Sequence, residues 1–211
     1  MKHIRSMIMA AAGAAMLGGA ATAQAQDLKI AVGFPPGSAA FYALDNLAKN
    51  IEANSDMKAK VFALSLLNLK ETPPGIRDGI ADMGFVLPPY YPAEYAETNL
   101  AANLSMLATT GEQIESPGTA MGAAMTEYVF LHCPECLTEH KRMNQVYLGT
   151  GTSPTYILHC TTPIRTMADL KNKKYRSGAA NFGRWAEAVG GTKVSVPGND
   201  IYEAMAQGVV D

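Results

Sequence analysis

Strand-like and helix-like segments alternate along residues 28–86, and this alternation limits the chain to an α/β fold. Residues 28–32 read Leu-Lys-Ile-Ala-Val, the composition of a strand, and a turn-rich stretch at 33–38 separates them from a helix expected over 39–53. Apolar residues recur in that helix at three- and four-residue steps. The remaining elements expected in this part are strands at 57–64 and 82–86 and a helix at 76–81. This order predicts a mostly parallel sheet covered by helices.

The alternation continues to the end of the chain. Further elements are expected as follows: a long helix at 119–140, strands at 145–148, 156–160, 174–176 and 193–196, and helices beginning at 166 and covering 179–189 and 201–207. The pairs Thr166/Asp169 and Asp200/Glu203 have the spacing of capping boxes at helix starts. Residues 209–211 begin another strand where the sequence stops, so we expect the front part of a longer protein.

The first 25 residues have the pattern of a secretory signal peptide. Lys2 and Arg5 precede an uncharged apolar run at 7–17, and the small residues Ala23 and Ala25 fit a cleavage site after Ala25. The run is shorter than the roughly 20 residues that span a bilayer. No later segment is both long and uncharged enough to span, so we expect an exported protein, periplasmic in a Gram-negative bacterium, that does not cross the membrane after cleavage.

Composition excludes several classes of function. The net charge is −2 and 48% of the residues are hydrophobic, so the chain lacks the basic excess that attracts nucleic acid and the polarity of a disordered protein. Gly149 and Gly151 have no third glycine at phosphate-binding spacing. We therefore expect no nucleic-acid partner and no cofactor.

The segment 163–176, Pro-Ile-Arg-Thr-Met-Ala-Asp-Leu-Lys-Asn-Lys-Lys-Tyr-Arg, resembles a signature of TRAP transporter substrate-binding proteins, the extracytoplasmic receptors of the C4-dicarboxylate type. The order of residues 185–211 fits the same family, and 79–84 fits it more loosely. The resemblance implies a two-lobed periplasmic-binding-protein fold of mixed, mostly parallel sheets. It implies a first lobe at 26–150 and the N-terminal part of a second, incomplete lobe at 151–211.

Arg176 is the main candidate for ligand binding. It ends a predicted strand just before a helix start, and ligands of open α/β sheets bind beyond the carboxyl ends of the strands. Helix N-termini attract anions, and a guanidinium matches a carboxylate with two parallel hydrogen bonds. The resemblance implies the same role, since family members grip the substrate carboxylate with an arginine at this position. A surface arginine in a weak ion pair is the alternative.

One feature departs from the family pattern. Many dicarboxylate-binding members carry a second arginine about twenty residues upstream, where this chain has Ser153-Pro154-Thr155-Tyr156 without a basic residue. A monocarboxylate, or an acid whose far end is neutral, is therefore favoured over succinate.

Other residues are weaker candidates for the ligand cleft. Phe34 and Ser38 follow the first expected strand, and Tyr90 and Tyr91 lie on a later loop of the same kind. Trp185 lies inside its expected helix, where packing is the alternative role. Aromatic rings with polar tips suit half-wet pockets.

The cysteines support an alternative function. Cys133 and Cys136 form a Cys-x-x-Cys pair, which suits a thiol–disulfide redox protein or a metal carrier, with His140 nearby and His159 later in the sequence. Against redox chemistry, the pair is expected late in a long helix. A structural disulfide, joining either of them to Cys160, is the simpler interpretation.

Taken together, the sequence predicts a binding protein rather than an enzyme. The resemblance implies capture of a small organic acid between two lobes and delivery to a TRAP permease made of small and large membrane subunits. The alternative is a periplasmic redox or metal-binding protein that uses Cys133 and Cys136.

Overall fold

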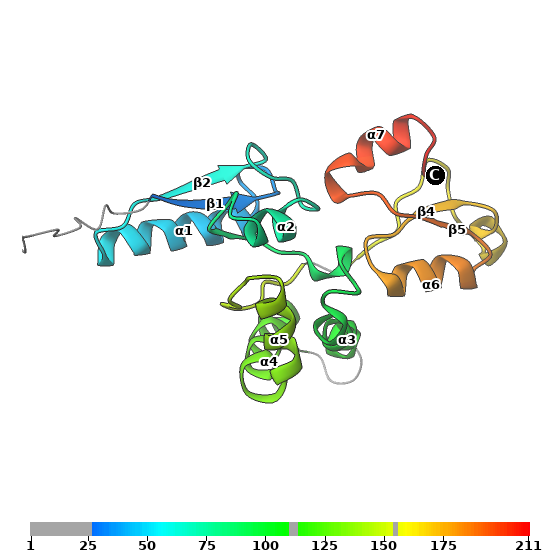
Figure 1. The fold of residues 1–211 in the computed structure, drawn as a ribbon. Coiled ribbons are helices and arrows are strands. Elements are labelled where there is room, and N and C mark those ends of the chain that lie inside the picture. Colours follow the sequence, from blue (N-terminus) through cyan, green and yellow to red (C-terminus); the bar gives the residue numbers. More distant parts are fainter. Residues whose placement is uncertain (1–26, 110–113, 154–155) are drawn as a thin grey trace, which may run out of the picture.

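A computed structural model describes residues 27–109, 114–153 and 156–211. Three groups of elements make up the described part of the molecule: a first sheet with two helices, a group of three helices, and a second sheet with two helices (Figure 1). The predicted signal peptide lies outside the described residues.

The first sheet has the strand order β2-β1-β3, and both pairs of strands are parallel. The strands are β1 (Leu28–Val32), β2 (Ala59–Ala63) and β3 (Met83–Gly84). β1 is central, and its residues Ile30, Ala31 and Val32 are fully buried. A short apolar run buried on both faces is typical of a central parallel strand.

Two helices accompany this sheet. α1 (Ala39–Asn54) packs against β1 and β2, and α2 (Thr72–Arg77) packs against β3. α1 begins where the Ser38 hydroxyl accepts a hydrogen bond from the Phe41 backbone N–H at 3.2 Å. A short 3-10 helix, η1 (Pro88–Tyr90), follows β3.

The helical group contains α3 (Ala96–Asn103), α4 (Pro117–His132) and α5 (Pro134–Arg142), with the 3-10 helix η2 (Leu104–Thr109) between the first two. Its core consists of Ala101, Met125, Val129, Cys133 and Cys136. Glu139 of α5 is buried and caps α3. Its carboxylate accepts hydrogen bonds from the Glu97 N–H (2.7 Å), the Thr98 N–H (3.0 Å) and the Thr98 hydroxyl (2.8 Å).

The second sheet pairs β4 (Lys174–Arg176) with β5 (Thr192–Val194) in parallel. α6 (Ala180–Ala188) packs against both strands. The 3-10 helices η3 (Met167–Leu170) and η4 (Gly198–Asp200) flank the sheet in sequence, and α7 (Ile201–Ala206) follows η4. Leu170, Tyr175 and Ala186 form the core of this part.

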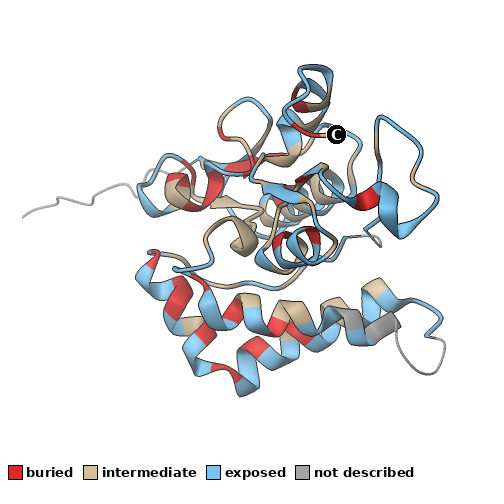
Figure 2. Ribbon diagram, turned by 90° about the vertical axis from the view of Figure 1, so that its right-hand side faces the viewer, coloured by how far each residue is buried: buried red, intermediate tan, exposed pale blue. Residues whose placement is uncertain are grey.

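Buried residues lie in all three groups rather than in one central block (Figure 2). The two sheets have separate cores, and hydrogen bonds between their loops join the two sides. In the described part of the chain, no helix has the length and apolar character needed to cross a bilayer.

The predicted long helix at 119–140 is wrong, because two helices occupy this stretch. Cys133 separates them with φ −132° and ψ 73°, outside the helical region. The ring of Pro134 disfavours the helical conformation at the preceding residue and suits the first position of a new helix.

The short helix is also displaced from the predicted 76–81 to Thr72–Arg77. Its two prolines stand in the first turn, where a missing N–H costs nothing. Gly79 (φ +76°) lies just past its end.

The strands predicted at 145–148 and 156–160 are absent from the described residues. Val146 is 83% exposed and Leu148 65% exposed, so neither side chain enters a sheet core. A side chain, rather than a neighbouring strand, bonds to the backbone close to this segment. The Thr150 N–H donates to the Thr126 hydroxyl at 3.1 Å.

Of the two predicted capping boxes, the Thr166/Asp169 box is confirmed, although it opens a 3-10 helix, η3. The Asp200/Glu203 box is wrong, because α7 begins without a side-chain cap. Residues 209–211 form no strand, although the Asp211 N–H donates to the Lys174 carbonyl at 2.9 Å.

Replacing Glu139 with Ala is expected to destabilise the protein by about 2 kcal/mol or more. The change removes the cap of α3 and leaves buried donors unpaired. Urea unfolding measures the loss. Glu127→Ala, at an exposed position of α4, is the matched control and should change the free energy of unfolding by less than about 0.5 kcal/mol. Equal effects of the two variants would contradict the capping role.

His140 predicts a pH dependence of stability. Burial lowers its pKa below the ordinary 6.5, although a side-chain hydrogen bond with Gln145 and the charge of Glu139 oppose the shift. As the pH falls through 6.5, the unfolded chain takes up a proton before the folded protein does, so the free energy of unfolding decreases. Thermal unfolding across this range should show a smaller decrease for His140→Phe than for the wild type. The exposed His132→Gln should behave like the wild type, and an unchanged slope in His140→Phe would contradict the prediction.

Candidate functional site

The carboxyl ends of the strands of both sheets meet at one place, which we call the seam: Gly33, Leu69, Tyr90, Arg176, Gly198 and Asn199. The first three residues follow strands β1, β2 and β3, and the others end β4 or follow β5. Hydrogen bonds join the two sides, as described below. In open α/β sheets the loops at this end of the strands form the ligand site.

Arg176, the last residue of β4, is half-buried in the seam. Its Nε donates to the Val196 carbonyl at 2.8 Å, and its Nη2 donates to the Tyr90 hydroxyl oxygen at 2.8 Å. None of the ion pairs found among the described residues includes Arg176. An arginine always carries a positive charge in proteins. Within the described residues, the hydrogen-bond partners of this charge are neutral oxygens only.

The Tyr90 hydroxyl oxygen receives a second hydrogen bond. The backbone N–H of Gly198 donates to it at 2.9 Å. The Arg176 guanidinium and the Gly198 N–H thus both donate to the Tyr90 oxygen, which lies on the opposite side of the seam. Converging N–H donors of this kind are the means by which proteins hold an oxyanion.

Gly178 provides the space for the guanidinium. A Cβ at this position would lie 2.6 Å from Nη1 and 2.9 Å from Cζ of Arg176, so the guanidinium rests on the glycine backbone. Gly178 lies two residues before α6, whose first turn carries no acidic residue. The partial positive charge of the helix N-terminus therefore adds to that of Arg176.

Asn199 makes a second connection across the seam. Its Nδ2 donates to the Gly33 carbonyl at 2.9 Å, and its Oδ1 accepts a longer bond of 3.5 Å from the Leu69 N–H. Asn199 is not among the site residues predicted from the sequence. The turn sequence Pro197-Gly198-Asn199 after a strand is the signal that could have found it, because asparagine side chains commonly bond to backbone in turns.

The helical group holds Tyr90 in place. Asn99 of α3 donates through Nδ2 to the carbonyl of Pro88, the first residue of η1, at 3.0 Å. Since Glu139 caps α3, a continuous set of contacts runs from α5 through α3 to the 3-10 helix that carries Tyr90. The position of Tyr90 therefore depends on side chains far from it in sequence.

Of the residues predicted from sequence, only Tyr90 contacts Arg176. Phe34 packs edge-on against Phe85, with ring centroids 5.5 Å apart. Ser38 caps α1. The Tyr91 hydroxyl donates to the Lys70 carbonyl at 2.7 Å, and burial raises the pKa of this tyrosine.

Trp185 packs against Tyr175, with centroids 5.1 Å apart, and is 42% exposed. This ring contact is with the core of the second sheet rather than with the seam. Ligand contact by Phe34, Ser38, Tyr91 and Trp185 stays a prediction.

The predicted disulfide to Cys160 is wrong, because Cys133 bonds to Cys136 and Cys160 is free. The break before α5 places the Cα atoms of Cys133 and Cys136 5.2 Å apart, within the range for a disulfide. Both are buried in the helical core. The pair lies at the start of a helix rather than late in one, but its burial and bonding leave no thiolate for a metal.

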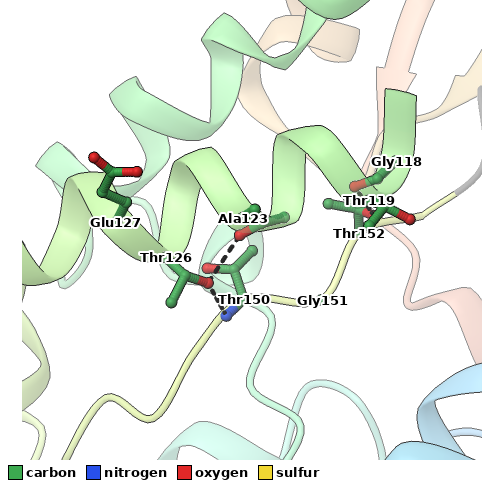
Figure 3. Close-up of a pocket in the computed structure, with 9 residues that line it drawn as sticks. Gly118, Thr119, Ala123, Thr126, Glu127, Thr150, Gly151 and Thr152 are labelled. Atoms are coloured by element: carbon green, nitrogen blue, oxygen red, sulfur yellow. Dashed lines mark hydrogen bonds between the residues drawn. The ribbon is translucent and has the colours of Figure 1, made fainter. Parts of the chain in front are cut away.

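An open hollow lies elsewhere, along α4. It has a volume of about 650 Å³, and its lining is small and mostly neutral: Gly118, Thr119, Gly122, Ala123, Thr126, Glu127, Thr150, Gly151 and Thr152 (Figure 3). The Thr126 and Thr152 hydroxyls are already bonded to the Gly122 and Gly118 carbonyls. No basic side chain is among these lining residues, and the one charged side chain is Glu127, so we place the candidate site for an anion at the seam instead.

The chain is similar to known bacterial solute-binding proteins in sequence and in fold. The family model DctP, described as bacterial extracellular solute-binding protein, family 7, matches residues 31–211. Among solved structures, a TRAP periplasmic solute-binding protein from Pseudomonas putida F1 with bound D-glucuronate has a TM-score of 0.65 at 22% identity, with 88% of this chain and 59% of that chain covered.

Two further structures extend the comparison. DctP7 of Bordetella pertussis, an extracytoplasmic solute receptor binding pyroglutamic acid, has a TM-score of 0.62 at 16% identity over 89% of this chain and 59% of that chain. A marine metagenome TRAP solute-binding protein in complex with 3-hydroxybenzoate has a TM-score of 0.62 at 19% identity over 88% and 56%. These matches confirm the two-lobed periplasmic binding fold. The chain spans less than two thirds of the length of these relatives.

Replacing Asn199 with Ala is expected to loosen the seam. The change removes the bond to Gly33 and the weaker one from Leu69, at a cost of about 1 kcal/mol in the free energy of unfolding. Hydrogen exchange at the Leu69 amide should accelerate. Asn46→Ala, on the exposed face of α1, is the control, and identical behaviour of the two variants would show that Asn199 does not hold the seam.

Proposed function

Since the chain belongs to the DctP family of bacterial extracellular solute-binding proteins, family 7, we propose that it binds a small organic acid at the seam. The carboxylate of the acid binds to Arg176, and the first-sheet loops cover the rest of the molecule. The observation that carries this proposal is a half-buried guanidinium with neutral partners only among the described residues.

The charge and position of Arg176 favour an anion. A cation removed from bulk water is costly unless a negative group compensates it, and half-burial makes the compensation stronger than at the surface. Arg176 uses Nε and one Nη2 proton for Val196 and Tyr90, which leaves further N–H groups of its fork for a carboxylate. A ligand carboxylate thus supplies the charge that this part of the protein lacks.

The ligands of related structures have the same functional group. D-glucuronate, pyroglutamic acid and 3-hydroxybenzoate are the ligands named for the proteins compared above, and each carries one carboxylate on a ring. Their remaining atoms differ widely. For this chain we infer a monocarboxylate, because Arg176 is the only basic side chain with a recorded contact to the seam in the described part of the chain.

The ligand's place at the seam also suits transport. An acid held there contacts both sheets and therefore favours the arrangement in which they are close, as in hinge closure of periplasmic binding proteins. We infer that this closed form delivers the acid to a membrane permease. We also infer that residues 1–25 direct the protein to the periplasm and are then removed.

Calorimetric titration with D-glucuronate, pyroglutamate and 3-hydroxybenzoate tests the proposal. At least one acid should bind the wild type, and Arg176→Ala should weaken that binding about 100-fold or more, because a charge-assisted pair is lost. Arg176→Lys keeps the charge but not the fork and should restore binding only in part.

Arg184→Ala serves as the matched control, since Arg184 is an exposed arginine of α6. Its affinity should equal that of the wild type. Binding that survives Arg176→Ala unchanged would remove Arg176 from the site and contradict the proposed function.

A further inference from the structure

We propose that the Tyr90 hydroxyl is an internal substitute for the ligand's carboxylate oxygen, and that it must leave Arg176 and Gly198 before an acid binds there. Tyr90 then lowers the affinity of the site for its own ligand. This inference rests on the proposed function and names a regulation of the same site.

The geometry of the donors supports the substitution. Arg176 Nη2 lies 2.8 Å and the Gly198 nitrogen 2.9 Å from the Tyr90 oxygen, ordinary distances for N–H groups that bond to one oxygen. A carboxylate oxygen in the same position accepts from the same two donors. As an ionised acceptor it forms stronger hydrogen bonds than a neutral phenol, so the exchange favours the acid.

The neighbouring tyrosines show that Tyr90 is bonded in a different way. The Tyr91 hydroxyl donates to the Lys70 carbonyl at 2.7 Å, and the Tyr95 hydroxyl donates to Gln145 Oε1 at 2.7 Å. Tyr90 only accepts, because within the described ranges its own hydroxyl proton has no acceptor. The Tyr91 and Tyr95 hydroxyls are anchored through their protons, whereas the Tyr90 hydroxyl is held by the two donors alone.

The surroundings allow Tyr90 to leave. It is half-buried at the end of η1, whereas Tyr95 is fully buried. The backbone of η1 is fixed at Pro88 by Asn99, so the ring can turn about its side-chain torsions while the backbone stays. Gly198 carries no side chain that would shield its N–H from an incoming oxygen.

The consequence for affinity follows from competition. When a site is free in only a fraction of the molecules, the apparent dissociation constant rises by the inverse of that fraction. Removing the phenol oxygen abolishes the competitor and leaves both donors available. A residue that merely contacted the ligand would have the opposite effect, since its loss would weaken binding.

Tyr90→Phe tests the proposal by calorimetry with the three acids used for Arg176. The variant should bind the acid that the wild type prefers about tenfold more tightly, since a hydrogen bond to a charged donor is lost from the competing state. Tyr128→Phe, at an exposed position of α4, is the matched control and should leave the affinity unchanged. Circular dichroism verifies that both variants are folded.

Weaker or equal binding by Tyr90→Phe would overturn the internal substitute. If binding needs Arg176 but Tyr90→Phe does not tighten it, only this inference fails and the proposed function stands. If no acid binds the wild type or Tyr90→Phe, both fail. As a second readout, the Gly198 amide resonance should shift on acid addition in the wild type, and an unshifted resonance in the presence of bound acid would also contradict the exchange.

Discussion

The contacts of the seam are built around the guanidinium of Arg176, which lies between the two sheets. Among the described residues, its hydrogen-bond partners are neutral oxygens only. Arg176 bonds to Val196 on its own side and to Tyr90 on the other. Gly178 leaves room for it, and Gly198 directs its N–H to the same oxygen. The result is a positively charged place at the carboxyl ends of parallel strands, where an α/β protein binds its ligand.

The helical group contributes to this site from a distance. Glu139 caps α3, α3 holds the backbone of η1 through Asn99, and η1 carries Tyr90. The buried Cys133–Cys136 disulfide lies at the start of α5, the helix that carries Glu139. The cysteine pair thus belongs to the buried core of the helical group, which supports η1.

Local sequence patterns predicted those parts whose cause is local. The buried run of β1, the period of α1 and the place of Arg176 at a strand end are examples, and the structure confirms each of them. Parts with a remote cause were missed or misjudged. α3 takes its cap from Glu139, 41 residues beyond Thr98, and Asn199 bonds to Gly33, 166 residues away. The long helix failed for a local reason, the proline at position 134, whose effect outweighed the apolar periodicity around it.

The most direct test of the account is a crystal structure of the protein with an organic acid that it binds. The account predicts a carboxylate oxygen within hydrogen-bond distance of the Arg176 guanidinium and the Gly198 nitrogen, with the Tyr90 hydroxyl displaced from both. An acid bound away from Arg176, with the contact between Tyr90 and Arg176 still in place, would contradict it.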